Sequence, residues 1–276
     1  MSGSRAWRRS WAGSSRGSKT SGAQSSIGWK TAAFAAYCAA SSASYLVNDV
    51  RDAPLDRVHP VKRARPIARG ELSPKTASAL AVVLVAVSFA LVVPLGIGSI
   101  AFLSAFLALQ ASYTLALKHV VLIDVMTIGG LFVVRAAAGA AAVQVPISPW
   151  LLLCTALLAL FLALAKRRGE LVLVGAEATP GRPVLEGYSL ALVDQLITVV
   201  AASTVISYCL YTFTARDSKA MMITIPFVVF GVFRYLLLMH RRDLGEEPEE
   251  VLLRDAPILL CIAGWAVCAA VVLAVT

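Results

Sequence analysis

Eight long apolar stretches constrain the fold of this 276-residue chain more than any other feature of its sequence. A bilayer's hydrocarbon core is about 30 Å thick and a helix rises about 1.5 Å per residue, so about 20 apolar residues can cross it. Charged residues make up only 15% of the chain, which excludes an ordinary soluble protein. The stretches cover residues 29–47, 76–95, 97–117, 121–143, 148–165, 190–213, 220–239 and 256–275. We therefore expect an all-α, polytopic membrane helix bundle, forming a single transmembrane domain over residues 29–276.

The remaining residues, 1–28, form a different kind of segment. They are rich in Ser, Gly and Arg and have too few apolar residues to bury a core, which predicts a disordered basic tail. The five cysteines lie in apolar stretches without a C-x-x-C pair, and the three histidines fall in separate loops. These spacings favour small buried hydrophobic side chains over ligands, so we predict no structural metal.

Lys and Arg are distributed unequally between the two sides of the predicted bundle. Fifteen lie in the connections 48–75, 118–120, 166–189 and 240–255, and two lie in the opposite connections. Short basic loops stay cytoplasmic, so we expect the long polar loops to face the cytoplasm of a cell that carries this protein in its plasma membrane. The basic tail conflicts with this orientation, because an even number of spans places it outside. We interpret the conflict as an absent first spanning helix or a start of the chain that is not the native one.

The first polar loop, residues 48–75, begins with an acidic cluster of Asn48, Asp49, Asp52 and Asp56. Their spacing places them on one face of a helix that continues out of the membrane. Stacked carboxylates repel one another, and a hard divalent cation bound through oxygen ligands would neutralise them. The cluster therefore predicts a site for Mg²⁺, with Mn²⁺ as the alternative, that holds a substrate diphosphate. The competing interpretation is a solvated helix end.

Four basic residues lie six to thirteen positions after Asp56: Lys62, Arg63, Arg65 and Arg69. Their side chains can bind phosphate oxygens that a metal leaves unpaired, and we favour Lys62 and Arg65 for substrate contact. The alternative role for some of them is anchoring to anionic lipid.

The pattern NDxxDxxxD at residues 48–56, followed by HPxKxxRPIAxG at residues 59–70, resembles the first signature of the UbiA-type intramembrane prenyltransferases. The resemblance extends over about residues 30–260. It implies an all-helical bundle, usually of nine spans, around a central cavity with a cytoplasmic cap, and Mg²⁺ that holds a diphosphate. This sequence offers eight spans, and the usual first helix has no counterpart in residues 1–28.

The basic segment, Lys166-Arg167-Arg168-Gly169-Glu170, helps to distinguish between branches of that family. Members with aromatic acceptors carry a second Asp-rich motif in the corresponding loop, and only one acid is present here. The segment therefore suits an additional phosphate better than a second strong metal site, although basic residues are also usual at helix ends. Together with Tyr188 and Arg234 downstream, it resembles the decaprenyl-phosphate phosphoribosyltransferase branch.

That resemblance implies a reaction. The branch transfers phosphoribose from 5-phosphoribosyl 1-diphosphate to a polyprenyl phosphate, such as decaprenyl phosphate, releases diphosphate and serves cell-wall arabinan synthesis. By the resemblance, Asp49, Asp52 and Lys62 have catalytic roles because they stabilise the leaving diphosphate, and Glu170 binds a ribose hydroxyl or orients Lys166. The alternative function is transfer of a prenyl group from a prenyl diphosphate to an aromatic or other acceptor.

Asp124, Arg135 and Arg234 lie inside predicted spans, where an ionised group is costly and therefore a candidate for function. Asp124 and Arg135 are about three turns apart on one helix face, and we expect them to line one cavity in which Arg135 meets a phosphate. Tyr113 and Lys118 end the third span and can reach the same site, although Lys118 can also snorkel to the interface. The predicted substrate-binding residues are Arg65, Tyr113, Lys118, Asp124, Arg135, Lys166, Arg167, Glu170, Tyr188 and Arg234.

Two other classes of protein fit the sequence less well. Buried charges and Pro-interrupted spans also suit an organic-anion transporter, but the acidic loop occurs once and the two halves show no internal repeat. Nucleic-acid binding is not predicted, because basic cytoplasmic loops account for the net charge of +9. The sequence does not predict the acceptor's chain length or the oligomeric state.

Overall fold

The computed structural model describes residues 21–58, 62–174, 183–214, 219–242 and 253–275. Within these residues the regular secondary structure is helical, which confirms the all-α prediction. The long helices are α1 (Ser21–Asp56), α2 (Pro74–Val92), α3 (Ile97–Leu115), α4 (Ile123–Ala142), α5 (Pro149–Val174), α6 (Leu190–Thr214), α7 (Ile225–Arg242) and α9 (Ala256–Val275). The short 3-10 helices are η1 (Lys62–Ala64), η2 (Val93–Leu95), η3 (Leu117–His119), η4 (Pro183–Gly187) and η5 (Ala220–Thr224).

Helix bounds differ from the predicted stretches at two functionally important places. α1 begins at Ser21, so residues 21–28 are helical, whereas residues 1–20 of the predicted tail lie outside the described residues. α5 continues to Val174, so the basic segment forms the last turns of a helix and is not a loop as expected. A helical basic segment fixes which of its side chains face the bundle.

Seven helical segments in the described part of the chain are long and apolar enough to cross a membrane, so the protein is a multi-pass membrane protein. The predicted span in α1, residues 29–47, is not among them because Lys30, Thr31 and several serines lower its hydropathy. α1 nevertheless belongs to the bundle and packs against α2, α3 and α4. Ala36, Ala40 and Ala43 are buried at this interface, since small residues allow helices to approach closely.

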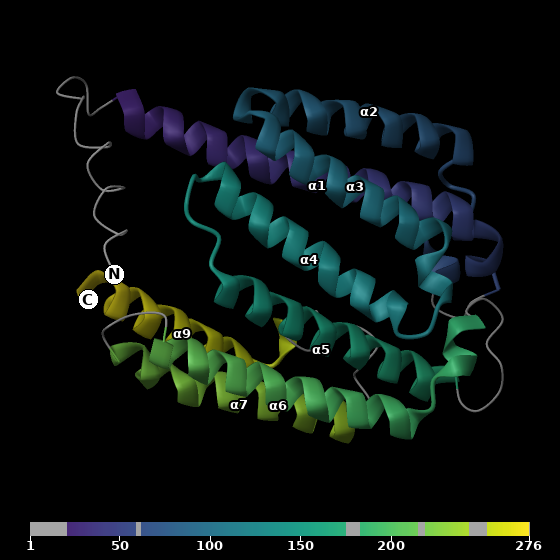
Figure 1. Ribbon diagram of the computed structural model, residues 1–276. Coiled ribbons are helices and arrows are strands. Elements are labelled where there is room, and N and C mark those ends of the chain that lie inside the picture. The colour runs from purple at the N-terminus through teal and green to yellow at the C-terminus, as the bar shows by residue number, and fades with distance from the viewer. Residues whose placement is uncertain (1–20, 59–61, 175–182, 215–218, 243–252, 276) are drawn as a thin grey trace, which may run out of the picture.

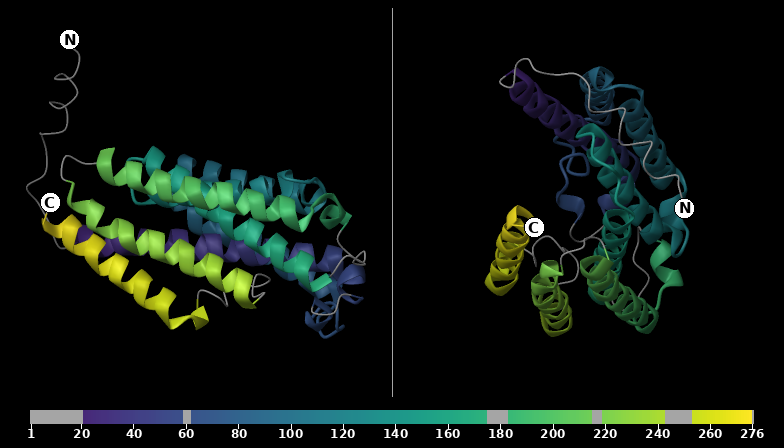
Figure 2. Two further views of the ribbon diagram at one scale, coloured as in Figure 1. Left: turned by 90° about the horizontal axis from the view of Figure 1, so that it is seen from below. Right: turned by 60° about the vertical axis from the view of Figure 1, so that its left-hand side comes forward.

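The helices pack mainly against their neighbours in sequence, from α1 with α2 through α4, α5 and α6 to α7 with α9. Viewed along the bundle they form a curved row (Figure 2). Figure 1 shows that α1 begins and α9 ends at one end of the bundle, and that the α1–α2, α3–α4 and α5–α6 connections meet at the other end. The bundle therefore gathers the first polar loop and the basic segment on one side.

Local sequence explains where α2 begins and ends. Ser73 precedes the helix, and its hydroxyl accepts a hydrogen bond from the Thr76 amide at 3.1 Å, with Pro74 at the first helical position. Pro94 lies in η2, where an α-helix cannot continue regularly, and Gly96 follows with a φ of 94°. These residues limit the apolar helix α2 to the length of one membrane crossing.

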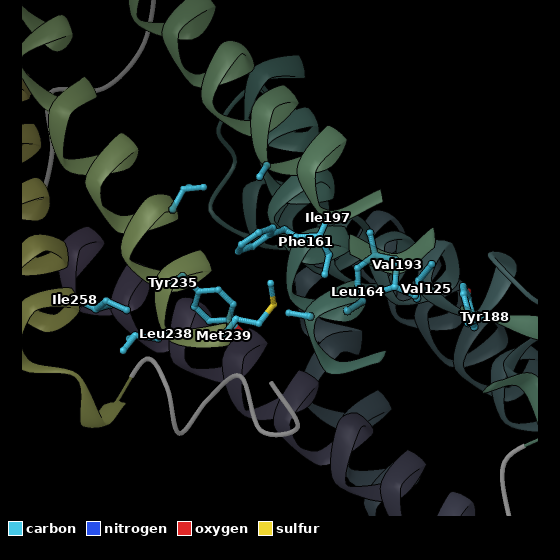
Figure 3. Close-up of a cluster of buried hydrophobic side chains, with 14 of the residues drawn as sticks. Val125, Phe161, Leu164, Tyr188, Val193, Ile197, Tyr235, Leu238, Met239 and Ile258 are labelled. Carbon is cyan, nitrogen blue, oxygen red and sulfur yellow. The ribbon is translucent and has the colours of Figure 1, made fainter. Parts of the chain in front are cut away.

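Two large apolar clusters hold the bundle together. One lies between α4, α5, α6, α7 and α9 and includes Phe161, Ile197 and Tyr235 (Figure 3). The other joins α1, α2, α3 and α4 around Leu103 and Phe106. A third, small cluster packs Ile67 of the first polar loop against α1 and α2, so apolar contacts fix this loop over the end of the bundle.

Candidate active site

The acidic cluster lies on the last turns of α1 and binds two cations from other parts of the chain. Asp49 Oδ1 and Asp56 Oδ2 both accept hydrogen bonds from Arg65 Nη1, at 2.8 Å and 2.9 Å. The two aspartates share a helix face because they are two turns apart. Arg65 follows η1, so the first polar loop folds back onto the helix from which it emerges.

The other half of the acidic cluster binds Lys118 in η3. Lys118 Nζ lies 3.2 Å from Asn48 Oδ1 and 2.5 Å from Asp52 Oδ1. The Lys118 residue is only 8% exposed, so it does not snorkel into the interface as the alternative interpretation allowed. The oxygens of the acidic cluster are therefore arranged as two pairs, each around one cation.

Burial raises the pKa of Asp49 above its ordinary value. Arg65 opposes this shift, whereas Asp56 and Asp52 add to it through charge repulsion. Burial is the largest of these effects, so the raised pKa of Asp49 reflects the cost of desolvating its charged form. An additional cation would favour the charged form of Asp49.

The donor chemistry of the acidic cluster fits Mg²⁺, because carboxylate and amide oxygens are the hard ligands that this ion prefers. Within the described residues, no three Asp, Glu, His or Cys side chains converge on a single metal position. The oxygens converge in pairs instead. A bound Mg²⁺ would thus need phosphate oxygens or water to complete its coordination.

The acidic cluster and its two cations form one polar network, and a second polar network lies between α4, α5 and η4. Arg167 is 1% exposed; its Nε lies 2.7 Å from Asp124 Oδ2, and its Nη1 binds Glu170 Oε2. Asp124 is fully buried and also accepts a hydrogen bond from the Tyr188 hydroxyl at 2.6 Å. Paired carboxylates compensate the buried guanidinium charge. The structure thus places Arg167 as a clamp between two carboxylates, and its expected contact with substrate stays a prediction.

Tyr188 connects this network to the start of α4. Its hydroxyl accepts a hydrogen bond from the Leu122 amide at 2.8 Å, and Leu122 has a φ of 67°, in the left-handed region. Burial and the hydrogen bond to Asp124 raise the pKa of Tyr188. Gly187 makes this junction possible, because a Cβ there would overlap the Val121 side chain. Tyr188 therefore joins two segments rather than facing an open site.

An ion pair connects the first polar loop to this second network. Lys62 Nζ of the first polar loop lies 3.7 Å from Glu170 Oε1 in the basic segment. Glu170 was expected near Lys166 or a ribose hydroxyl, and the structure places it between Arg167 and Lys62. Tyr113 is close enough to Arg167 to interact with it electrostatically. The bundle therefore brings the two predicted polar regions into direct contact.

Lys166 differs from its neighbour Arg167. It is partly exposed, and the described part of the structure contains no carboxylate partner for its amine. Its predicted contact with substrate stays a prediction. Of the cations in the basic segment, Lys166 is the one whose charge is not already compensated by a described carboxylate.

Arg135 and Arg234 lie apart from these networks. The Arg135 guanidinium stacks over the rings of Phe132 and Phe106, at 4.3 Å and 5.7 Å from their centroids. It is about 16 Å along α4 from Asp124, so the two side chains do not touch, and the cavity that we expect them to line together stays a prediction. Arg234 binds Asp255 through two hydrogen bonds and thereby connects α7 to the start of α9.

The contacts of Arg168 were not predicted. Arg168 Nε lies 2.8 Å from Asp194 Oδ1, and its Nη1 donates to the Met239 carbonyl oxygen at 3.1 Å. These contacts connect α5, α6 and α7. Asp194 is an acid inside a predicted span, where an ionised group is costly. The argument that selected Asp124 as a candidate functional residue therefore applies to Asp194 as well.

Residues 20–253 match the UbiA prenyltransferase family. The decaprenyl-phosphate phosphoribosyltransferase of Mycolicibacterium smegmatis is 33% identical over 245 residues, covering 84% of this chain and 76% of that protein. The protein of the same name from Corynebacterium glutamicum is 34% identical, with 86% and 73% covered. A UbiA homolog from Archaeoglobus fulgidus, solved with GPP and Mg²⁺, shares the fold with a TM-score of 0.68 at 16% identity, covering 89% of this chain and 85% of that one. This protein therefore belongs to the UbiA prenyltransferase family.

Proposed function

We propose that this protein transfers phosphoribose from 5-phosphoribosyl 1-diphosphate to a polyprenyl phosphate and releases diphosphate, for synthesis of cell-wall arabinan precursors. The names of the relatives that are about one third identical over most of the chain support this reaction. The structural observation that carries the proposal is the ion pair between Lys62 and Glu170, which joins an acidic region to a basic one. A donor with a diphosphate at one end and a 5-phosphate at the other suits two such adjacent regions.

The acidic cluster would hold Mg²⁺, which when bound supplies Lewis-acid stabilisation of the negative charge on the leaving diphosphate. Arg65 binds the acidic cluster, Lys62 belongs to the same polar loop, and both donate to diphosphate oxygens. Glu170 is held by Arg167, so it fixes the position of Lys62. Lys166 binds the 5-phosphate, because its charge remains available.

The bond changes follow from the chemistry of the two substrates. An oxygen of the prenyl phosphate attacks the anomeric carbon of the ribose, and the bond from that carbon to the diphosphate oxygen breaks with its electron pair. The acceptor phosphate is already anionic at neutral pH, so no strong general base is needed. The residues of the site therefore act by positioning the anions and stabilising the leaving group.

We further propose that the site faces the cytoplasm from the plasma membrane. The excess of Lys and Arg in the connections at this end of the bundle supports that orientation. Protease accessibility of the first polar loop in oriented vesicles tests it. Cleavage from the cytoplasmic side is expected, and cleavage only from the opposite side would contradict the orientation.

The reaction itself is tested with purified protein in lipid nanodiscs. With labelled phosphoribosyl diphosphate and decaprenyl phosphate, we expect a lipid-linked phosphoribose and an equal amount of diphosphate. EDTA and the Asp52→Asn substitution should both abolish this product. The alternative function is supported by the Archaeoglobus fulgidus homolog, which binds GPP together with Mg²⁺. Transfer of only a prenyl group, from a prenyl diphosphate to an aromatic acceptor, would establish it and contradict our proposal.

A further inference from the structure

Arg65 and Lys118 bind oxygens of the same side chains that the proposed function assigns to Mg²⁺. Each cation bridges two members of the acidic cluster, with contacts between 2.5 Å and 3.2 Å. A cation bound to one oxygen of a carboxylate neutralises part of the negative charge that would hold a metal, and it repels a metal that binds the same side chain. Metal binding and these ion pairs therefore compete for the same ligands.

The local charge makes this competition unfavourable for a metal alone. The three carboxylates of the acidic cluster and the two cations that they bind have a net charge of −1. A divalent cation would place two more positive charges beside a guanidinium and an ammonium group. A diphosphate that arrives with the metal supplies anionic oxygens to which both side chains can turn. The cost of releasing the carboxylates is then offset by new charge-assisted hydrogen bonds.

We propose that Arg65 and Lys118 are resident counter-ions that couple the binding of divalent metal to the binding of diphosphate. Metal alone binds the acidic cluster weakly, and metal with diphosphate binds it tightly. This inference rests on the proposed function in one respect, the assignment of the metal to the acidic cluster. It adds a specific role for two side chains and a binding order in which metal and donor enter together.

The two counter-ions differ in how firmly they are held. Lys118 is 8% exposed and reaches the acidic cluster from η3, so burial restricts its alternatives. The Arg65 side chain is 35% exposed and can move into solvent at lower cost. We therefore expect Lys118 to compete with the metal more strongly than Arg65.

The test measures metal binding without turnover. Mn²⁺ binding to the full chain in nanodiscs of uncharged lipid is followed by electron paramagnetic resonance, with and without inorganic pyrophosphate. A protein-free titration corrects for the Mn²⁺ that pyrophosphate binds itself. We expect the wild-type protein to bind Mn²⁺ at least about tenfold more tightly with pyrophosphate, the size of one charge-assisted hydrogen bond. Equal affinity in both conditions would overturn the inference.

Two substitutions test the counter-ions separately. Lys118→Met should tighten the binding of Mn²⁺ alone by about tenfold and reduce the gain from pyrophosphate, and Arg65→Gln should do the same to a smaller extent. Arg51→Gln is the matched control, because it removes a positive charge from the part of α1 that carries the acidic cluster. The Arg51 guanidinium donates to the Leu115 carbonyl oxygen at 3.4 Å instead of to the acidic cluster. This substitution should change neither value.

The remaining outcomes separate this inference from the proposed function. Unchanged or weaker Mn²⁺ binding in both Lys118→Met and Arg65→Gln would overturn the counter-ion role. The role would also be overturned if Arg51→Gln tightened the binding of Mn²⁺ alone as much as these two substitutions do. Full binding of Mn²⁺ and pyrophosphate by Asp52→Asn would overturn the assignment of the metal site, and with it the inference. Coupled binding by a wild-type protein that transfers no phosphoribose would support the inference and contradict the proposed function.

Discussion

At the scale of single residues, two neighbouring cations of α5 have different surroundings. Arg167 is buried between Asp124 and Glu170, whereas Lys166 is partly exposed without a described carboxylate partner. The sequence could not separate them, because both are basic residues at the end of an apolar stretch. The distinction arises from the helix continuing to Val174, which fixes one side chain toward the bundle and leaves the other near its surface.

Arg167→Ala should destabilise the protein strongly. It leaves two buried carboxylates without their shared cation, and breaking a buried ion pair from one side costs about 3–5 kcal/mol. We expect a clear fall in the thermal unfolding temperature in detergent. Lys166→Ala is the matched control and should leave that temperature almost unchanged. Equal stability of the two variants would show that Arg167 is not a structural clamp.

Tyr188→Phe should also lower stability, because it removes a hydroxyl that bonds both Asp124 and the Leu122 amide. Loss of a buried partner costs about 1–3 kcal/mol. Tyr37→Phe offers a matched control, because the Tyr37 hydroxyl is buried without a hydrogen-bond partner among the described residues. Thermal unfolding should separate the two variants, and a larger loss in Tyr37→Phe would refute this explanation.

At the scale of elements, apolar runs predicted the helices well, because the length of a membrane span is set by the bilayer. α9 covers the predicted residues 256–275, and α6 differs from its predicted stretch by one residue. The acidic cluster does lie on the helical continuation of α1. The contacts of Asp124 were not predictable, because helical spacing gives the face on which a residue lies but not the residue from another helix that meets it.

Contact between η4 and the start of α4 requires a residue without a side chain at position 187. Gly187→Ala should displace η4, because the new methyl group would overlap Val121. We expect reduced stability and weaker donor binding, since Tyr188 follows directly, and partial recovery in the double variant with Val121→Ala. Gly98→Ala in α3 meets open space and serves as the control. A Gly187→Ala protein as stable and active as the control would contradict this role.

At the scale of the whole molecule, the bundle places the acidic cluster and the basic segment at one end. α1 begins and α9 ends at the opposite end (Figure 1), because α1 runs along the bundle together with the seven apolar segments. Lys62 of the first polar loop and Glu170 of the basic segment are 108 positions apart in the sequence, yet they meet in an ion pair. Only the packing of α1, α4 and α5 creates this meeting, which a linear pattern does not contain.

In the proposed reaction the acidic cluster and the basic segment divide one donor between them, and a comparison of two donors tests this division. With phosphoribosyl diphosphate, Lys166→Ala should lose about 1.5–3 kcal/mol of donor binding, the value of a charge-assisted hydrogen bond. With ribose 1-diphosphate, which lacks the 5-phosphate, Lys166→Ala should bind the donor almost as tightly as the wild-type protein does. Asp49→Ala should lose activity with both donors. An equal loss of affinity for both donors in Lys166→Ala would contradict the division.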